Sequence, residues 1–99
     1  MNHFIGTACV VDIKTSLRPD DSIKYFFLLE FDFSHVNKKT GEVKDKTLTI
    51  SASGVPKDSH RDRWEGIRPL DIVYLSGALN ASDDGEIFLT IKDLGVTNE

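Results

Sequence analysis

The sequence predicts an all-β domain, a small five-stranded Greek-key barrel with one short helix between the third and fourth strands. Three observations lead to this expectation. The chain has 99 residues, which is the length of one domain. Five segments have the composition of β-strands, and the second, third and fifth of them show the strand period of two. One stretch has helical spacing, and it follows the third of these segments. We therefore expect residues 1–99 to fold as a single domain.

The second strand carries the clearest pattern. Every odd position of "IKYFFLLEFDF", Ile23–Phe33, is apolar. Successive side chains of a strand point to opposite faces, so this face is expected in the core. The inward positions expected in the third and fifth strands are Leu48, Ile50, Ala52, Ile87, Leu89 and Ile91. The five expected strands are His3–Lys14, Ile23–Phe33, Lys46–Gly54, Asp71–Leu79 and Glu86–Leu94.

The helix is expected within Pro56–Ile67. Proline suits the first position of a helix. Trp64 and Ile67 are three residues apart and would place one face on the sheet. The connections between strands are polar and rich in turn-forming residues. The expected loops and hairpin turns are Ser16–Ser22, Asn37–Lys44 and Asn80–Glu86.

The order of three strands, a helix and two strands is the layout of the OB-fold, a small Greek-key barrel. An immunoglobulin-like sandwich would need about seven strands and no helix at this place. A ferredoxin-like fold would need a helix after the first strand, where Ser16–Ser22 is too short and too rich in turn-forming residues. The sequence therefore favours the OB-fold.

Composition limits the classes of function. The formal net charge is -4, so the chain as a whole repels nucleic acid and anionic membranes at long range. Any binding of nucleic acid must therefore use a local basic surface. The single cysteine, Cys9, excludes an intramolecular disulfide, and its apolar surroundings predict a buried side chain rather than a nucleophile. The chain has neither a membrane-spanning stretch nor a signal-peptide core, so we expect a cytoplasmic protein.

Three segments resemble the bacterial single-stranded DNA-binding proteins and their shorter relative, primosomal replication protein N. Asn37–Gly54 resembles the long hairpin and third strand, with a Thr-Gly-Glu turn and a closing glycine. Trp64–Leu79 resembles the helix exit and fourth strand, and Asp83–Val96 the closing hairpin and fifth strand. The resemblance implies an OB-fold, binding of single-stranded DNA in replication, recombination or repair, and a homodimer or homotetramer.

The chain departs from this family at the positions where the family stacks bases on aromatic side chains. Pattern alignment places His35, Thr47 and Ser53 there. A histidine can stack on a base, whereas threonine and serine cannot. The resemblance therefore implies the fold more strongly than it implies the activity.

Binding of a single strand needs a positive groove and aromatic faces on which bases stack. The hairpin and neighbouring strands carry lysines, although Glu42 and Asp45 interleave with them, and a merely solvated hairpin is the alternative. We expect the hairpin Asn37–Lys46 to act as a movable flap, with His35 and Phe88 stacking on bases. The polar wall beside it is expected on the third strand, at Thr47, Thr49, Ser51 and Ser53. The candidate nucleic-acid-binding residues are Lys14, Lys24, His35, Lys38, Lys39, Lys44, Lys46, Thr47, Thr49, Ser51 and Phe88.

Outward apolar residues predict a subunit interface. Phe26 and Leu28 lie opposite the core stripe of the second strand, and Tyr74 lies on the fourth. A ligand platform or ordinary packing are the alternatives for Phe26. First strands of two subunits could also pair antiparallel, which would cover an exposed edge. The run His60–Glu65 is interpreted as a helix that docks Trp64 with its charges in water, and a second basic-aromatic patch is the alternative.

Catalysis has no support in the sequence. The histidines are scattered, one cysteine gives no zinc-type spacing, and no phosphate loop or nucleophile motif occurs. We expect no enzymatic activity, no cofactor and no metal. The predicted function is binding of single-stranded DNA, or RNA, with little sequence preference, with replication proteins as further partners and no membrane. The alternatives are a protein-binding assembly subunit, and a phage or plasmid protein that occupies a host replication protein's surface.

Overall fold

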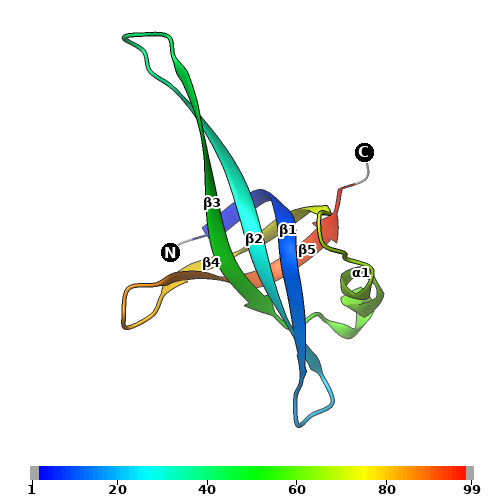
Figure 1. Cartoon of the computed structure of the whole chain (residues 1–99). Coiled ribbons are helices and arrows are strands. Elements are labelled where there is room, and N and C mark those ends of the chain that lie inside the picture. Colours follow the sequence, from blue (N-terminus) through cyan, green and yellow to red (C-terminus); the bar gives the residue numbers. More distant parts are fainter. Residues whose placement is uncertain (1–2, 98–99) are drawn as a thin grey trace.

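The computed structural model describes residues 3–97, apart from the side chains of residues 33–35. Five strands and one short helix follow each other in the predicted order (Figure 1). The elements are β1 (His3–Leu17), β2 (Ile23–Val36), β3 (Val43–Gly54), the 3-10 turn η1 (Asp58–His60), α1 (Arg61–Glu65), β4 (Ile72–Ala81) and β5 (Ile87–Val96).

The strands close into a barrel in the order β1-β2-β3-β5-β4, with β4 paired back to β1. Strands β3 and β5 run parallel, and every other neighbouring pair runs antiparallel. Closure satisfies most of the backbone groups that an open sheet would leave at its edges. The predicted fold class, a five-stranded OB-fold barrel with a helix between the third and fourth strands, is confirmed.

The core contains the predicted stripe of β2. Tyr25, Phe27, Leu29 and Phe31 are all buried, and the side chain of Phe33 lies outside the described part of the chain. From the other strands the barrel interior receives small and branched apolar side chains, which pack around this stripe. These residues are Ala8, Val10, Ala52, Val73, Leu75, Leu89, Ile91 and Leu94.

Helix α1 closes one end of the barrel through Trp64. The indole is buried and meets the rings of Tyr25 and Phe27 edge-on, with centroid distances of 5.5 and 5.9 Å. Ile67, just beyond the helix, is buried as well. The docking of Trp64 and Ile67 on the barrel is therefore confirmed, and the charged residues of His60–Glu65 stay on the surface.

Gly54, the last residue of β3, leaves the space beside it to the indole of Trp64. A Cβ at this position would lie 3.0 Å from the Cη2 atom of Trp64 and 3.1 Å from the Cβ of Ile91. Both distances are tighter than ordinary van der Waals contact, so any larger residue would push the helix away from the barrel. The close approach of helix and sheet explains the glycine.

Several predicted boundaries are wrong. The helix is only five residues long, and Pro56 precedes it and the 3-10 turn rather than starting it. Strands β1, β2 and β3 extend further than predicted, so Ser16 and Leu17 belong to β1 and Val43 and Lys44 to β3. The glycine and proline residues indicated the turns correctly. The ends of the strands were not predicted, because their polar residues do not alternate with apolar ones.

Two residues expected in the core are exposed. Leu48 is 49% exposed because it lies beyond the part of β3 that pairs with β5, Ser51–Ser53. Ile87 is 61% exposed because it is the first residue of β5, paired at the hairpin end with Ala81. Cys9 is half-buried rather than buried. At Leu48 and Ile87 the strand continues past the edge of the core, whereas Cys9 lies between the buried residues Ala8 and Val10 and points to the other face of β1.

Strands β2 and β3 continue beyond the barrel as a two-stranded arm, which is the long projection at the top of Figure 1. The turn at its tip is closed by the backbone, since the N–H of Asn37 donates to the Glu42 carbonyl at 2.8 Å. Gly41 takes a positive φ of 72° there, which a glycine adopts without strain. The predicted hairpin is confirmed. Among residues 3–97, no helix is long and apolar enough to cross a bilayer.

Candidate functional site

A bulge in β1 determines which side chains reach the outer face of the barrel. Val10 pairs with Leu29, but the next pair joins Asp12 to Leu28, so Val11 is an extra residue. Before the bulge, even-numbered residues such as Val10 point into the core. After it, Asp12 and every second residue that follows point outward.

Four neighbouring strands therefore present two parallel rows of side chains on one outer face. Each row consists of residues that are direct partners across β1, β2, β3 and β5. The first row is Lys14, Phe26, Ser53 and Thr90, and the second is Asp12, Leu28, Ser51 and Phe88. Large apolar side chains on β2 and β5 thus flank serines on β3, and the two residues of β1 at the end are charged.

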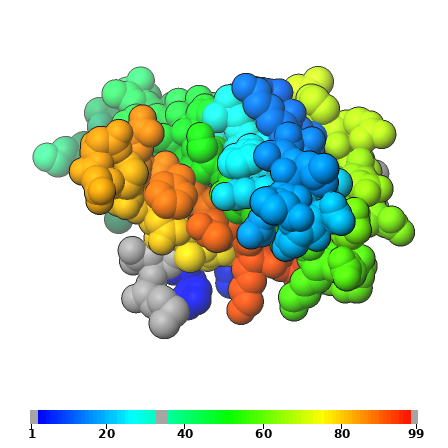
Figure 2. All heavy atoms as spheres, turned by 90° about the horizontal axis from the view of Figure 1, so that it is seen from below, coloured from blue at the N-terminus to red at the C-terminus, as the bar shows by residue number. Residues whose placement is uncertain are grey.

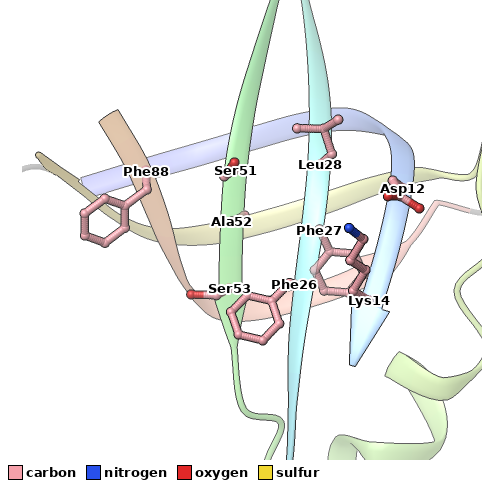
Figure 3. A pocket seen from close by; sticks show the side chains of 9 residues that line it. All are labelled: Asp12, Lys14, Phe26, Phe27, Leu28, Ser51, Ala52, Ser53 and Phe88. Carbon is pink, nitrogen blue, oxygen red and sulfur yellow. The ribbon is translucent and has the colours of Figure 1, made fainter. Parts of the chain in front are cut away.

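The rows enclose an open hollow of about 410 Å³ (Figure 3). Its apolar walls are Phe26, Leu28 and Phe88, and the small side chains of Ser51 and Ser53 leave the space between them open. The turn between β1 and β2 and the turn between β4 and β5 stand on either side of β2 and β3 in the space-filling view (Figure 2). The hollow is thus wide enough for planar groups and open to an extended chain.

The ring of Phe26 is both accessible and close to positive charge. Its side chain is 41% exposed, and the Nζ of Lys24 lies 5.2 Å from the ring centroid. Lys14 is its direct partner on β1 and also lines the hollow. A cation held near an aromatic face is attracted by the ring quadrupole. The site can therefore offer a stacking surface beside two ammonium groups.

The turn next to Phe88 is held by its own polar side chains. The hydroxyl of Ser82 donates to the carboxylate of Asp84, and the backbone N–H of Glu86 also points to it. Hydrogen bonds from Ser82 and then from Glu86 lower the pKa of the Asp84 carboxyl. Gly85, with a positive φ of 87°, completes this turn. The start of β5, and with it Phe88, is thereby fixed in direction.

The arm separates some of the candidates that the sequence grouped together. Lys38 and Lys39 lie in the turn at its tip. Lys44 and Lys46 are even positions of β3, on the ribbon face opposite to Thr47. The lysines thus do not all line the wall formed by the odd positions of β3.

The polar wall of β3 has acidic neighbours as it leaves the hollow. Thr47 is the partner of Asp32 on β2, and Thr49 is the partner of Glu30. Of the predicted wall residues, Ser51 and Ser53 line the hollow, and Thr47 and Thr49 do not. The backbone of His35 pairs with Lys44 on the arm, and its side chain lies outside the described residues.

The predicted interface residues fall on two surfaces. Phe26 and Leu28 line the hollow beside Lys14, Ser51 and Phe88. Tyr74 instead lies on the outer face of β4, where it pairs with Thr7. Its ring covers Gly95, because a Cβ there would lie 2.3 Å from the Tyr74 Cζ. Ile5 and Ile72 are exposed on the same two strands.

Sequence reasoning missed Asp12 as a residue of the hollow. The signal for Asp12 was present, since buried apolar positions change from even at Ala8 and Val10 to odd at Ile13. Such a change of phase within one strand indicates a bulge. Among residues 3–97, no group of three or more His, Cys, Asp or Glu side chains could hold a metal ion.

Known structures share this architecture. A structure of the protein PriB from Ralstonia solanacearum matches 99% of this chain and 99% of its own, with 17% identity and a TM-score of 0.72. A Plasmodium falciparum SSB in complex with ssDNA matches 99% and 96%, with 14% identity and a TM-score of 0.79. A small single-stranded DNA-binding protein from Streptomyces coelicolor matches 98% and 95%, with 12% identity and a TM-score of 0.66.

These similarities are similarities of fold. No family model matches the chain, and no curated protein matches it. Each match covers at least 95% of both chains, so the shared fold extends over the whole of each. The resemblance to single-stranded DNA-binding proteins and to the primosomal protein, drawn from sequence motifs, is therefore confirmed at the level of the fold.

Proposed function

We propose that the protein binds single-stranded nucleic acid, DNA above all, with little sequence preference and without catalysis. The observation that carries this proposal is the outer hollow, in which Phe26 and Phe88 flank the serines of β3 beside Lys14. The structures that share the fold support it, because their names describe an SSB bound to ssDNA and a single-stranded DNA-binding protein.

The physical chemistry of the hollow suits an unpaired strand. Base stacking on an aromatic ring contributes about 1–3 kcal/mol per base and tolerates any base, since every base has a π-face. Phe26 offers an exposed ring, and Ser51 and Ser53 are small enough to let a base approach it. Lys14 lines the hollow and Lys24 holds its ammonium over the Phe26 ring, so both could attract the phosphates of a nucleotide bound there.

The arm extends the path of the strand. In this proposal His35, Thr47 and Thr49 accompany the nucleic acid along the ribbon. The lysines of the arm supply long-range attraction that the acidic body lacks, whichever face they occupy. These lysines are Lys38, Lys39, Lys44 and Lys46.

We further propose that the protein is a homodimer or homotetramer. The first half of β1, residues 3–8, pairs with β4 but has no partner on β2, so one edge of this segment is free among the described residues. Ile5, in the middle of it, is 85% exposed, and Tyr74 lies on the adjacent strand. Antiparallel pairing of two such edges would cover both the backbone groups and the apolar side chains.

The biological setting follows from the same proposal. Single-strand binding belongs to replication, recombination or repair, with other replication proteins as partners. A cytoplasmic location agrees with the one free cysteine, Cys9, because a reducing compartment keeps such a thiol unpaired.

A protein-binding assembly subunit is the second candidate. The observation that favours it is the pair of carboxylates at Glu30 and Asp32, directly beside the polar wall of β3. They would repel a phosphate backbone on that stretch. OB-folds host both kinds of function, so the fold does not decide between them.

One titration distinguishes the two candidates. A fluorescent oligo(dT) is titrated with the protein at low and at moderate salt, with an oligo(U) of equal length to compare RNA. The proposal expects binding that weakens steeply as salt rises, because lysines displace counterions from phosphates. Absence of binding at low salt would leave the assembly role as the better account.

A further inference from the structure

Asp12 is an unexpected residue in a site for a polyanion. Its carboxylate lines the hollow next to Leu28, two register positions away from Lys14 and Phe26. A phosphate placed against it would be repelled by like charge. A strand that binds in the hollow must therefore present some other part of the nucleotide to this end of it.

The bulge holds this carboxylate with one oxygen free. The backbone N–H of Ile13 donates to Oδ1 of Asp12 at 2.9 Å, which fixes the orientation of the group. Within residues 3–97, Oδ2 accepts no hydrogen bond, and Asp12 forms no ion pair with Lys14 or any other cation. The free oxygen is a fixed acceptor at the edge of an apolar hollow (Figure 3).

We propose that Asp12 accepts a hydrogen bond from the amino group of a base, so that the hollow prefers amino-bearing bases to thymine and uracil. The inference rests on the proposed function and assigns its base preference. Cytosine carries an N4 amino donor, and a carboxylate is a suitable acceptor for it. Uracil and thymine carry the O4 carbonyl at the same place, so their oxygen would face the carboxylate and be repelled.

The arrangement of the two rows supports this orientation. Phe26 shares its row with Lys14, whereas Asp12 heads the row of Leu28, Ser51 and Phe88. In the proposed orientation a base stacks on Phe26 and its phosphate lies near the ammonium groups of Lys14 and Lys24. The hydrogen-bonding edge of the base then points toward Asp12 in the second row. Asp12 is itself exposed, so water competes for this hydrogen bond and its contribution stays that of an ordinary one. The base preference therefore depends on the positive Lys14 in the first row and the negative Asp12 in the second.

The test compares oligo(dC) with oligo(dU) of equal length, at one salt concentration and slightly alkaline pH. The two pyrimidines differ in the amino or carbonyl group at C4 and in whether N3 carries a proton. We expect the wild-type protein to bind oligo(dC) about five-fold more tightly for each base at this subsite, which is the ordinary contribution of one hydrogen bond.

The variant Asp12→Asn isolates the residue without disturbing the bulge. The amide oxygen can still accept from the Ile13 N–H, so the amide NH₂ takes the place of the free oxygen and becomes a donor. We expect the preference to disappear or to turn toward oligo(dU). Asp62→Asn removes the same charge from α1, outside the hollow, and should leave the preference intact.

Each outcome decides something. Equal affinity of the wild-type protein for both oligonucleotides overturns the inference and leaves the proposed function standing. A preference for oligo(dC) that survives in Asp12→Asn overturns it as well. Failure to bind either oligonucleotide removes the proposed function itself and the inference with it.

Discussion

The ammonium group of Lys24 lies 5.2 Å from the centre of the Phe26 ring, on the outer face of β2. The two residues are neighbours on one face of the strand, so the pairing follows from the period of two. It gives one point of the surface both a flat apolar face and a positive charge. A nucleotide has the complementary pair, a flat base and a negative phosphate.

Phe26→Ala is expected to weaken binding of oligo(dT) by about five- to 150-fold, the loss of one stacked base. The side chain is 41% exposed, so its removal should change the thermal midpoint little. Fluorescence anisotropy measures the affinity. Leu70→Ala, an exposed leucine outside both the hollow and the proposed subunit edge, serves as the control and should bind like the wild type. Unchanged affinity in Phe26→Ala would exclude this ring from the binding surface.

Charge reversal of the arm should appear mainly in the salt dependence. Replacing Lys38, Lys39, Lys44 and Lys46 by glutamate is expected to weaken binding and to flatten the plot of log affinity against log salt. For a single strand the slope falls by about 0.7 for each phosphate that the arm no longer neutralises. The affinity is measured at four salt concentrations for both proteins. A parallel shift with the original slope would mean that the arm binds no phosphates.

Gly54→Ala is expected to destabilise the fold by about 1–3 kcal/mol, the ordinary cost of overpacking. The new methyl group would meet the Trp64 ring at 3.0 Å and Ile91 at 3.1 Å. Urea denaturation measures the free energy of unfolding. Gly66→Ala is the control, since the nearest atoms to its Cβ would lie at an ordinary van der Waals distance of 3.6 Å or more. Equal stability of both variants would show that α1 can shift at no cost.

Leu70→Gly is expected to stabilise the protein by about 1 kcal/mol. Leu70 has a φ of 76°, in the left-handed region that costs a residue with a Cβ about that much. The side chain is 81% exposed, so its removal gives up little buried area. Leu17→Gly, also an exposed leucine but at the end of β1, should instead destabilise. A drop in the thermal midpoint of Leu70→Gly would show that packing of the leucine side chain outweighs the strain.

The sequence allowed the fold to be predicted because the strongest signals were local. The apolar stripe of β2 and the glycines of the turns identified the order of strands, and Trp64 identified the docking face of the helix. Strand ends were harder, because Leu48 looks like a core residue until the partner strand that would cover it is known to stop short. Burial at the end of a strand depends on its neighbours and not on its own pattern.

The site was predicted only in pieces. Lys14, Ser51, Ser53 and Phe88 were predicted to bind nucleic acid, and Phe26 was predicted as a subunit contact rather than as a wall of the same hollow. Two features of the fold prevented prediction of the complete hollow. The bulge at Val11 changes which residues of β1 point outward, and the strand order places β5 beside β3. Sequence alone did not reveal that cross-strand neighbourhood. The sequence could, however, have predicted that Lys44 and Thr47 lie on opposite faces of β3, because one is an even and the other an odd position of the strand.

The most direct test of the account is a map of amide chemical shifts in the labelled protein as oligo(dT) is added. The account predicts that the largest changes fall on residues 12–14, 26–28, 51–53 and 88, which come from four different strands and meet at one hollow. Changes confined to the outer face of β1 and β4 around Ile5 and Tyr74, or no changes at all, would contradict it.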